Sequence, residues 1–232
     1  MPNRTLPRRV APAEERREQI LRAARRIFAE SGYRGTQIES VADALRIGKG
    51  TVYRYFDSKK KLFIAVANRA MQEMGESTAR GARAEQNLVK KIALAMRGQL
   101  EFIDNNPDVV EILLQERTEF RDEFTPTYIV YRDANLSHLE AVLREGMSQG
   151  LIRRMSVTAA ANMLCDLIYG IIMVGYMRKE RRLGETGKDA IEMAFNGLLT
   201  PEGQATARFR RVPPPPPYGG PRSPKASKLP KR

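Results

Sequence analysis

Two short helical patterns, separated by a break that contains glycine, limit the folds open to this chain of 232 residues more than any other feature. Apolar residues from Ile38 to Leu45 are spaced i, i+3, i+4 and i+7, which marks one face of a helix of about two turns. A break follows at residues 46–49, and within residues 50–56 two apolar side chains stack four positions apart. Two short helices around such a turn form a helix-turn-helix pattern.

The second short helix carries polar side chains that suit a DNA surface. Thr51, Tyr53 and Arg54 lie away from its apolar face and offer a hydroxyl, a phenol and a guanidinium. Arginine can pair with two acceptors of guanine, whereas threonine, tyrosine and lysine contacts to phosphate fix the register without reading the sequence. We therefore predict that Arg54 reads bases and that Tyr53 holds the DNA backbone.

Neighbouring segments supply the support that two such short helices need. Helical spacing from Ala13 ends at Gly32, and this first helix should pack behind the other two. Thr36 stands three residues before Glu39, which predicts a capping box; a helix N-terminus also attracts phosphate, so Thr36 is expected at the DNA as well. Ser58 is placed to cap a longer fourth helix.

Helical spacing continues beyond this region, and no period-two alternation bounded by turn residues occurs. The chain is therefore predicted to be all-α with about nine helices. The later helices are expected at 88–103, 107–120, 128–149, 157–177 and 187–199. The predicted domains are a disordered basic arm at 1–12, a three-helix DNA-binding domain at 13–60, a larger helical ligand-binding and dimerisation domain at 61–200, and a disordered proline-rich basic tail at 201–232.

Basic charge is concentrated at the two ends of the chain. The net charge is +13, from 40 Lys and Arg against 27 Asp and Glu. Residues 1–75 hold 16 basic and 8 acidic side chains, residues 76–200 hold 16 and 18, and residues 201–232 hold 8 and 1. This asymmetry favours a polyanionic partner for the ends, although general solubility accounts for it as well. The tail is a linker, an electrostatic arm for DNA, or a proline-rich ligand of a partner.

Several features argue against export or membrane insertion. Cys165 is the only cysteine, so no intrachain disulfide forms, and the N-terminus lacks the apolar segment of a signal peptide. Residues 157–177 are long enough to span a bilayer but contain Asn162 and Asp166, whose polar groups are costly there. We expect instead a buried helix in a cytoplasmic protein that makes no membrane contact.

Residues 14–65 resemble the DNA-binding domain of the tetracycline-repressor (TetR) family of transcriptional regulators. The resemblance rests above all on the run Ile47–Phe56, IGKGTVYRYF, which Lys59 and Leu62 follow. Beyond this region the chain is similar to the family only in its all-helical layout, because the family diverges there with its ligands.

The resemblance implies that the third helix lies in the major groove of double-stranded DNA. The implied contact residues are Thr36, Tyr53, Tyr55 and Lys59 at phosphates, Gly50, Thr51 and Arg54 at bases or nearby backbone, and Lys49 beside them. The chain departs from the family pattern at four positions. Gly48 replaces a usual capping Ser or Thr, Tyr55 replaces a commoner His, and Lys60 and Lys61 stand where acidic residues are frequent, which should strengthen the field at the phosphates.

The resemblance further implies a homodimer on a palindromic operator, released by a small-molecule effector, so that a repressor is the expected role. We predict the dimer interface at 157–177 and 187–199, because a helix that is apolar on nearly all sides must be covered on each of them. The alternative is that these helices pack only within their own subunit.

Aromatic and polar residues in the middle of the chain are candidates for the effector site. They are Phe102, Glu116, Phe120, Phe124, Tyr128, Tyr131, His138, Asp166 and Tyr169. Such a set would suit a mainly apolar ligand with one or two polar groups. Equally, aromatic side chains at helical spacing can simply form the core.

Enzyme chemistry has little support in the sequence. One His and one Cys do not build a Cys/His metal site, and no nucleophile with a spaced base is present, so we expect no enzyme, no metal and no cofactor. The alternative to a regulator is an architectural DNA-binding protein that uses its basic ends without sequence preference. A discrete palindromic footprint would distinguish the regulator from uniform coverage of DNA.

Overall fold

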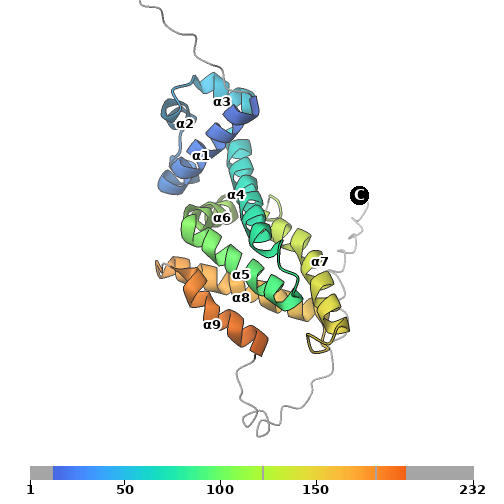
Figure 1. Ribbon diagram of the computed structural model, residues 1–232. Coiled ribbons are helices and arrows are strands. Elements are labelled where there is room, and N and C mark those ends of the chain that lie inside the picture. The colour runs from blue at the N-terminus through green and yellow to red at the C-terminus, as the bar shows by residue number, and fades with distance from the viewer. Residues whose placement is uncertain (1–12, 122, 181, 197–232) are drawn as a thin grey trace, which may run out of the picture. The chain divides into compact units, whose positions relative to one another are not determined.

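The computed structural model describes residues 13–121, 123–180 and 182–196, which form nine α-helices and no strand (Figure 1). This confirms the predicted all-α fold. The helices are α1 Ala13–Gly35, α2 Ile38–Ala44, α3 Lys49–Tyr55, α4 Lys59–Ala82, α5 Leu88–Asn105, α6 Asp108–Glu119, α7 Thr127–Ser148, α8 Val157–Met177 and α9 Leu183–Asn196. The predicted disordered arm and tail lie outside the described residues.

Gly32 interrupts α1 as predicted, although helical turns resume after it. Its φ of 73° and ψ of 164° are favourable for glycine alone, and the helix bends there. The predicted capping box of α2 is wrong. Gln37 is the N-cap residue and makes no side-chain cap hydrogen bond, whereas Thr36 is buried and its hydroxyl donates to the Gly32 carbonyl oxygen at 2.7 Å. The bend turns Thr36 inward, so its hydroxyl serves the end of α1.

Helices α1 to α4 enclose the first of two hydrophobic cores, here called the N-terminal core. Phe28 of α1 and Phe63 of α4 pack edge to face with their ring centroids 5.0 Å apart. Val52, the buried residue of α3, is 1% exposed against this core, and Ile112 and Phe120 reach it from α6. The short recognition helix is therefore held by tertiary packing rather than by its own length.

The second core, here called the C-terminal core, fills the space among the later half of α4 and helices α5, α7, α8 and α9. Leu100 of α5 is fully buried in it, with Leu143 of α7, Ile168 of α8 and Ile191 of α9 around it. The described residues of both cores belong to one compact unit.

Helix α4 contributes to both cores. Leu62 and Val66 lie in the N-terminal core, and Met71 and Met74, further along the helix, lie in the C-terminal core. Figure 1 shows α4 continuing from the α1–α3 region into the later helices. The predicted domain boundary at residue 60 thus falls at the start of a continuous helix, and any movement of α4 acts on both cores.

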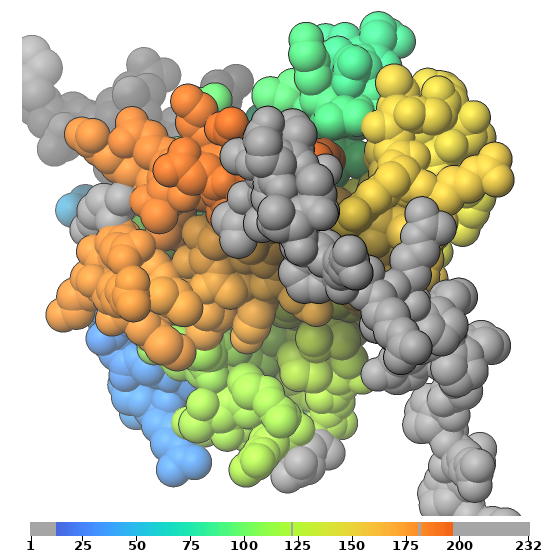
Figure 2. All heavy atoms as spheres, turned by 90° about the horizontal axis from the view of Figure 1, so that it is seen from below, coloured from blue at the N-terminus to red at the C-terminus, as the bar shows by residue number. Residues whose placement is uncertain are grey.

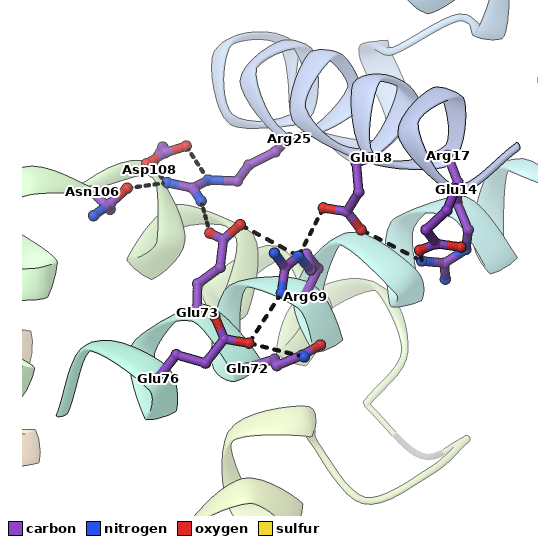
Figure 3. Close-up of polar contacts among 10 residues, drawn as sticks. All are labelled: Glu14, Arg17, Glu18, Arg25, Arg69, Gln72, Glu73, Glu76, Asn106 and Asp108. Atoms are coloured by element: carbon purple, nitrogen blue, oxygen red, sulfur yellow. Dashed lines mark hydrogen bonds and ion pairs between the residues drawn. The ribbon is translucent and has the colours of Figure 1, made fainter. Parts of the chain in front are cut away.

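Ion pairs also join α1 to the later helices, as Figure 3 shows. Arg25 of α1 pairs with Asp108 at the start of α6 and with Glu73 of α4, and its guanidinium also donates to the side-chain oxygen of Asn106. One turn before Glu73, Arg69 pairs with Glu18 of α1. These contacts connect α1, which packs in the N-terminal core, to α4 and α6.

Helix α8 is less covered than its composition predicted. By length and composition it is the one described helix able to cross a membrane, with a mean hydropathy of 1.8, yet only 11% of that apolar window is buried. Met163 and Met177 are 66% and 70% exposed. Burial of α8 on all sides is therefore not reached within the single chain, because α5, α7 and α9 cover only part of α8.

Candidate nucleic-acid interface and ligand cavity

The turn between α2 and α3 sets the direction of the recognition helix. Arg46 takes the left-handed backbone conformation of this turn, with φ 52°, whereas Gly48 is extended and serves as the N-cap of α3. Gly48 gives α3 no side-chain cap, as its departure from the family pattern implies. The buried side chain of Val52 then directs the opposite face of α3 outward.

The outward face of α3 presents the predicted base-reading groups. Arg54 is exposed, has no ion pair among the described residues, and lies with its Cζ 5.8 Å from the ring centroid of Tyr55. Tyr53 is 37% exposed, Thr51 is half-buried, and a Cβ at Gly50 would meet open space. Arg54 is therefore available to the edge of a base, and Gly50 allows close approach of a DNA backbone.

Lys49, the first residue of α3, forms an ion pair with Glu39 of α2. The hydrogen bond from Lys49 lowers the pKa of Glu39, and the hydrogen bond to Glu39 raises the pKa of Lys49. Both groups are therefore charged at neutral pH. The pair links the two helices of the motif, and Glu39 competes with any phosphate for Lys49.

Lys59, the first residue of α4, is tied to the protein by its own ammonium group. Its Nζ donates to the carbonyl oxygens of Thr36 at 3.0 Å and Arg34 at 3.4 Å, and lies 4.6 Å from the ring centroid of Tyr33. An ammonium carries three donors, so a phosphate contact remains compatible with these bonds. Lys59 thus satisfies two carbonyl oxygens at the end of α1. Its side chain is also partly exposed to solvent.

Two expectations about the DNA face need correction. Thr36 is 1% exposed and its hydroxyl is engaged by Gly32, so that hydroxyl is not placed for a phosphate. The positive charges of Lys60 and Lys61 are paired, with Glu123 and Asp57, so they add less to the field than expected. The pairing of Lys60 is not evident from local spacing, because Glu123 lies 63 residues away, whereas Asp57 and Lys61 stand four residues apart, as a local pair on a helix would.

A cavity of about 460 Å³ opens among α4, α5, α7 and α8. Three of the predicted effector residues line it: Tyr128, Tyr131 and His138 of α7. Burial raises the pKa of Tyr128 and of Tyr131, so both phenols are neutral at physiological pH and can donate or accept a hydrogen bond. The cavity falls within the usual size range of small-molecule sites.

The other predicted effector residues do not line this cavity. Phe102 lies in the C-terminal core, and Phe120 and Phe124 stack beneath Lys60 at the N-terminal core. Asp166 is exposed and pairs with Arg132, and Tyr169 is exposed on the outer side of Tyr128, with ring centroids 5.0 Å apart.

Glu116 is also outside the cavity. It is 2% exposed, and its carboxylate accepts hydrogen bonds from the backbone N–H and the hydroxyl of Thr127 at the start of α7. Burial raises the pKa of Glu116, which these two bonds partly offset. Its role is to join α6 to α7.

The sequence pattern did not indicate the cations of the cavity. Arg83 at the end of α4, Lys91 in α5 and Arg132 in α7 all line it. Arg83 and Lys91 flank the short α4–α5 connection, which is the one local feature that places them together. The described residues contain no group of three or more His, Cys, Asp or Glu side chains that could hold a metal ion.

Comparison with known proteins agrees with this arrangement. Residues 20–66 match the sequence profile of the bacterial regulatory proteins of the tetR family. YhgD, an uncharacterised HTH-type transcriptional regulator of Bacillus subtilis (strain 168), is 24% identical over 68% of this chain and 83% of its own length. The HTH-type transcriptional repressor AcnR of Corynebacterium efficiens is 34% identical over 51% of this chain and 61% of its own length.

A solved structure shares the fold over most of the chain. It is that of the transcriptional regulator FadR from Bacillus subtilis in complex with stearoyl-CoA, which superposes with a TM-score of 0.66 at 21% identity, covering 78% of this chain and 99% of that one. The matched proteins are regulators rather than enzymes, which confirms the non-enzyme prediction. Residues 20–66 thus carry the DNA-binding region of the tetR family of bacterial regulatory proteins, and most of the chain shares the fold of a solved regulator.

Proposed function

We propose that this protein is a ligand-responsive repressor that binds a palindromic operator as a homodimer and is released by a small, mainly apolar effector. The observation that carries the proposal is the position of α4. This one helix lies in the core that supports α3 and also forms a wall of the cavity. A ligand in the cavity therefore touches the element that positions the recognition helix.

DNA binding would use the exposed face of α3. Arg54 is the candidate for reading guanine, with Thr51 beside it, and Tyr53 and Tyr55 are candidates for phosphate contacts. Lys49 would contact DNA after leaving Glu39. A regulator that acts on DNA in this way would work in the cytoplasm.

The homodimer would form through α8 and α9. Both helices carry exposed apolar side chains, among them Met163, Val174 and Met177 of α8 and Met193 of α9. Figure 2 shows α8 and α9 together on one face of the molecule. A Cβ at Gly170 would meet nothing within 4 Å, so a helix of the partner has room to approach closely there. Exposed apolar area of this kind marks an interaction surface, and twofold pairing of the same patch is its simplest use.

The cavity supports the effector part of the proposal. Its buried apolar lining includes Met74 of α4, Ile92 and Met96 of α5, and Ile168 of α8. The related FadR structure contains stearoyl-CoA, so a long apolar ligand is one class to test. The effector would act by favouring a dimer geometry in which the two recognition helices no longer match successive major grooves.

A path from the cavity to the recognition unit follows α4. Met74 and Gly75 line the cavity, and the adjacent Glu73 pairs with Arg25 of α1 (Figure 3). A shift or rotation of α4 that accommodates a ligand would change this ion pair, and with it the position of the N-terminal core. Coupling of this kind is reciprocal, so operator DNA must weaken effector binding by the same factor.

To test the proposal, DNA fragments that bind the full-length protein are first selected from a random-sequence pool. The protein is then footprinted on the selected fragments. A regulator gives a discrete palindromic site, bound by a dimer, and an effector lowers the affinity for that site. Uniform coverage, with no preferred sequence, would instead support the architectural alternative, in which the basic ends act without base reading.

A further inference from the structure

The charges around the cavity are of one sign. Arg83, Lys91 and Arg132 line it, and none of its described lining residues is Asp or Glu. Residues 76–200 as a whole hold 16 basic and 18 acidic side chains, so the positive wall does not follow from the composition of this region. Basic side chains are therefore concentrated in the lining of the cavity.

Two of the three cations lack a compensating charge. Arg132 pairs with Asp166 at 3.1 Å and with Asp133 at 3.5 Å. Neither Arg83 nor Lys91 forms an ion pair with any residue that the structure describes. A ligand with a negative group would therefore meet two uncompensated cations, whereas a ligand with a positive group would meet only repulsion.

The two uncompensated cations lie at one end of the cavity. Arg83 is the C-cap residue of α4 and Lys91 is in the first turns of α5, on either side of the short connection between these helices. Earlier on α4, Met74 lies in the C-terminal core together with the buried Met96 of α5 and Ile168 of α8. The cavity thus has its two unpaired cations at one end and buried apolar side chains at the other, where Tyr131 also approaches Gly75 and the neighbouring Arg132 is already paired with Asp166.

We infer that the effector is an amphipathic anion, with a carboxylate or phosphate group held by Arg83 and Lys91 and an apolar chain or ring system between α4, α5, α7 and α8. This inference rests on the proposed function only where it calls the ligand an effector. Binding of the anion in the cavity does not require that the anion releases DNA. Arginine and lysine both bind carboxylate and phosphate by charge-assisted hydrogen bonds. Because the charged side chains that line the cavity are all positive, a lipophilic cation is not the preferred ligand.

Calorimetric titration of the full-length protein with four probes of equal chain length tests the inference. The probes are dodecanoate, dodecyl phosphate, uncharged dodecanol and dodecyltrimethylammonium, with the charged probes kept below their micelle concentrations and dodecanol below its solubility limit. At least one anion is expected to bind about tenfold or more tightly than dodecanol, because hydrogen bonds to charged groups are strong, and the ammonium probe is expected to bind most weakly. Comparison of the two anions tells whether carboxylate or phosphate is preferred.

Substitution of both cations identifies the head-group site. The Arg83→Gln and Lys91→Gln double variant should lose the advantage of the anion over dodecanol and bind dodecanol unchanged. Lys90→Gln is the matched control, because Lys90 is exposed on the same helix and does not line the cavity. The inference is overturned if no probe binds, if the ammonium probe binds as tightly as the anions, or if the double variant keeps the anion preference.

Operator affinity measured in parallel separates this inference from the proposed function. If an anion binds through Arg83 and Lys91 but leaves operator affinity unchanged, the cavity assignment stands and the induction proposal fails. If dodecanol releases the operator and neither anion does, the induction proposal stands and the anionic assignment fails.

Discussion

Arg25 of α1 donates two hydrogen bonds to the carboxylate of Asp108 at the start of α6, from Nε to Oδ2 at 2.5 Å and from Nη2 to Oδ1 at 2.8 Å. This bidentate pair joins residues 83 positions apart in the chain. The side chain of Arg25 is 16% exposed, and Glu73 and Asn106 accept from two of its three remaining donors. A planar guanidinium suits such a site better than an ammonium, because its donors are fixed in a fork.

Loss of this guanidinium should destabilise the protein. Arg25→Gln leaves Asp108 without its cation and leaves Glu73 with Arg69 alone, at 3.5 Å, so we expect the free energy of unfolding to fall by about 1–3 kcal/mol. Urea unfolding at a fixed protomer concentration measures it, since dimer formation makes stability depend on concentration. Arg22→Gln is the control, because Arg22 is exposed on the same helix without an ion pair among the described residues. Equal losses in both variants would show that the network adds nothing.

Arg54→Ala should relax the base preference of the protein. If Arg54 pairs with guanine, its loss removes about 1–3 kcal/mol of discrimination at one position of each half-site. Competition binding across single-base variants of the operator measures this. Lys59→Ala is the contrast, because a phosphate contact carries no sequence information and its loss should weaken all operators alike and lower the salt slope. Uniform weakening by Arg54→Ala would remove its base-reading role.

Glu39→Gln should increase affinity for DNA of any sequence. The carboxylate of Glu39 holds Lys49 in the free protein, so its neutralisation releases one cation to the phosphates and removes one repelling charge. Binding measured over a range of salt concentrations should show tighter binding at each and no change in base preference. Glu30→Gln on α1 removes an equal charge away from the motif and serves as the control. The same gain in both variants would mean that net charge alone is responsible.

Most helices were predictable from the sequence because each depends on local spacing, although α9 begins at Leu183 rather than at the predicted residue 187. Ser58 caps α4 through a hydrogen bond from the Lys61 backbone N–H to its side-chain oxygen at 3.1 Å, as predicted, and α8 has the predicted bounds Val157–Met177. Contacts between distant segments were not predictable in the same way. Thr36 fits a capping pattern, but the bend at Gly32 turns its side chain inward.

The two candidate sites differ in the same way: the DNA-binding face depends on local spacing, whereas the cavity depends on contacts between distant segments. Residues of α3 were assigned because the inward and outward faces of a short helix follow from its periodicity and from Val52. The cavity depends on which faces of four helices meet, which periodicity alone does not fix. Tyr131 therefore lines the cavity whereas Phe120 lies in the N-terminal core, although both are aromatic residues at helical spacing.

Met163→Glu should prevent dimer formation. Met163 is 66% exposed on α8, and a carboxylate placed at the proposed helical interface would face its own copy across the twofold axis or lie in an apolar contact. Light scattering after size-exclusion chromatography should show a monomer, and operator affinity should fall because the two half-sites are no longer bound together. Leu151→Glu, 50% exposed and outside α8 and α9, is the control. A dimer that survives Met163→Glu would place the interface elsewhere.

Gly75→Ala should narrow the cavity while stabilising α4. A Cβ at Gly75 would lie 3.1 Å from the Tyr131 hydroxyl oxygen and 3.2 Å from its Cε2, so the ring, which lines the cavity, must move by a few tenths of an ångström. Alanine in place of glycine inside a helix contributes up to about 1 kcal/mol, and we expect the unfolding free energy to rise by less than that because the ring is displaced.

Gly81→Ala separates the two effects of this change. Gly81 lies on the same helix, and a Cβ there would meet only the Leu94 carbonyl oxygen, at 3.9 Å. It should therefore stabilise α4 without altering dodecanoate binding, whereas Gly75→Ala should weaken dodecanoate binding measured by calorimetry. Equal dodecanoate affinity in the two variants would mean that the Tyr131 ring does not border the ligand. Weaker binding in Gly75→Ala alone would show that the helix linking the cavity to the recognition unit is also the surface on which the ligand rests.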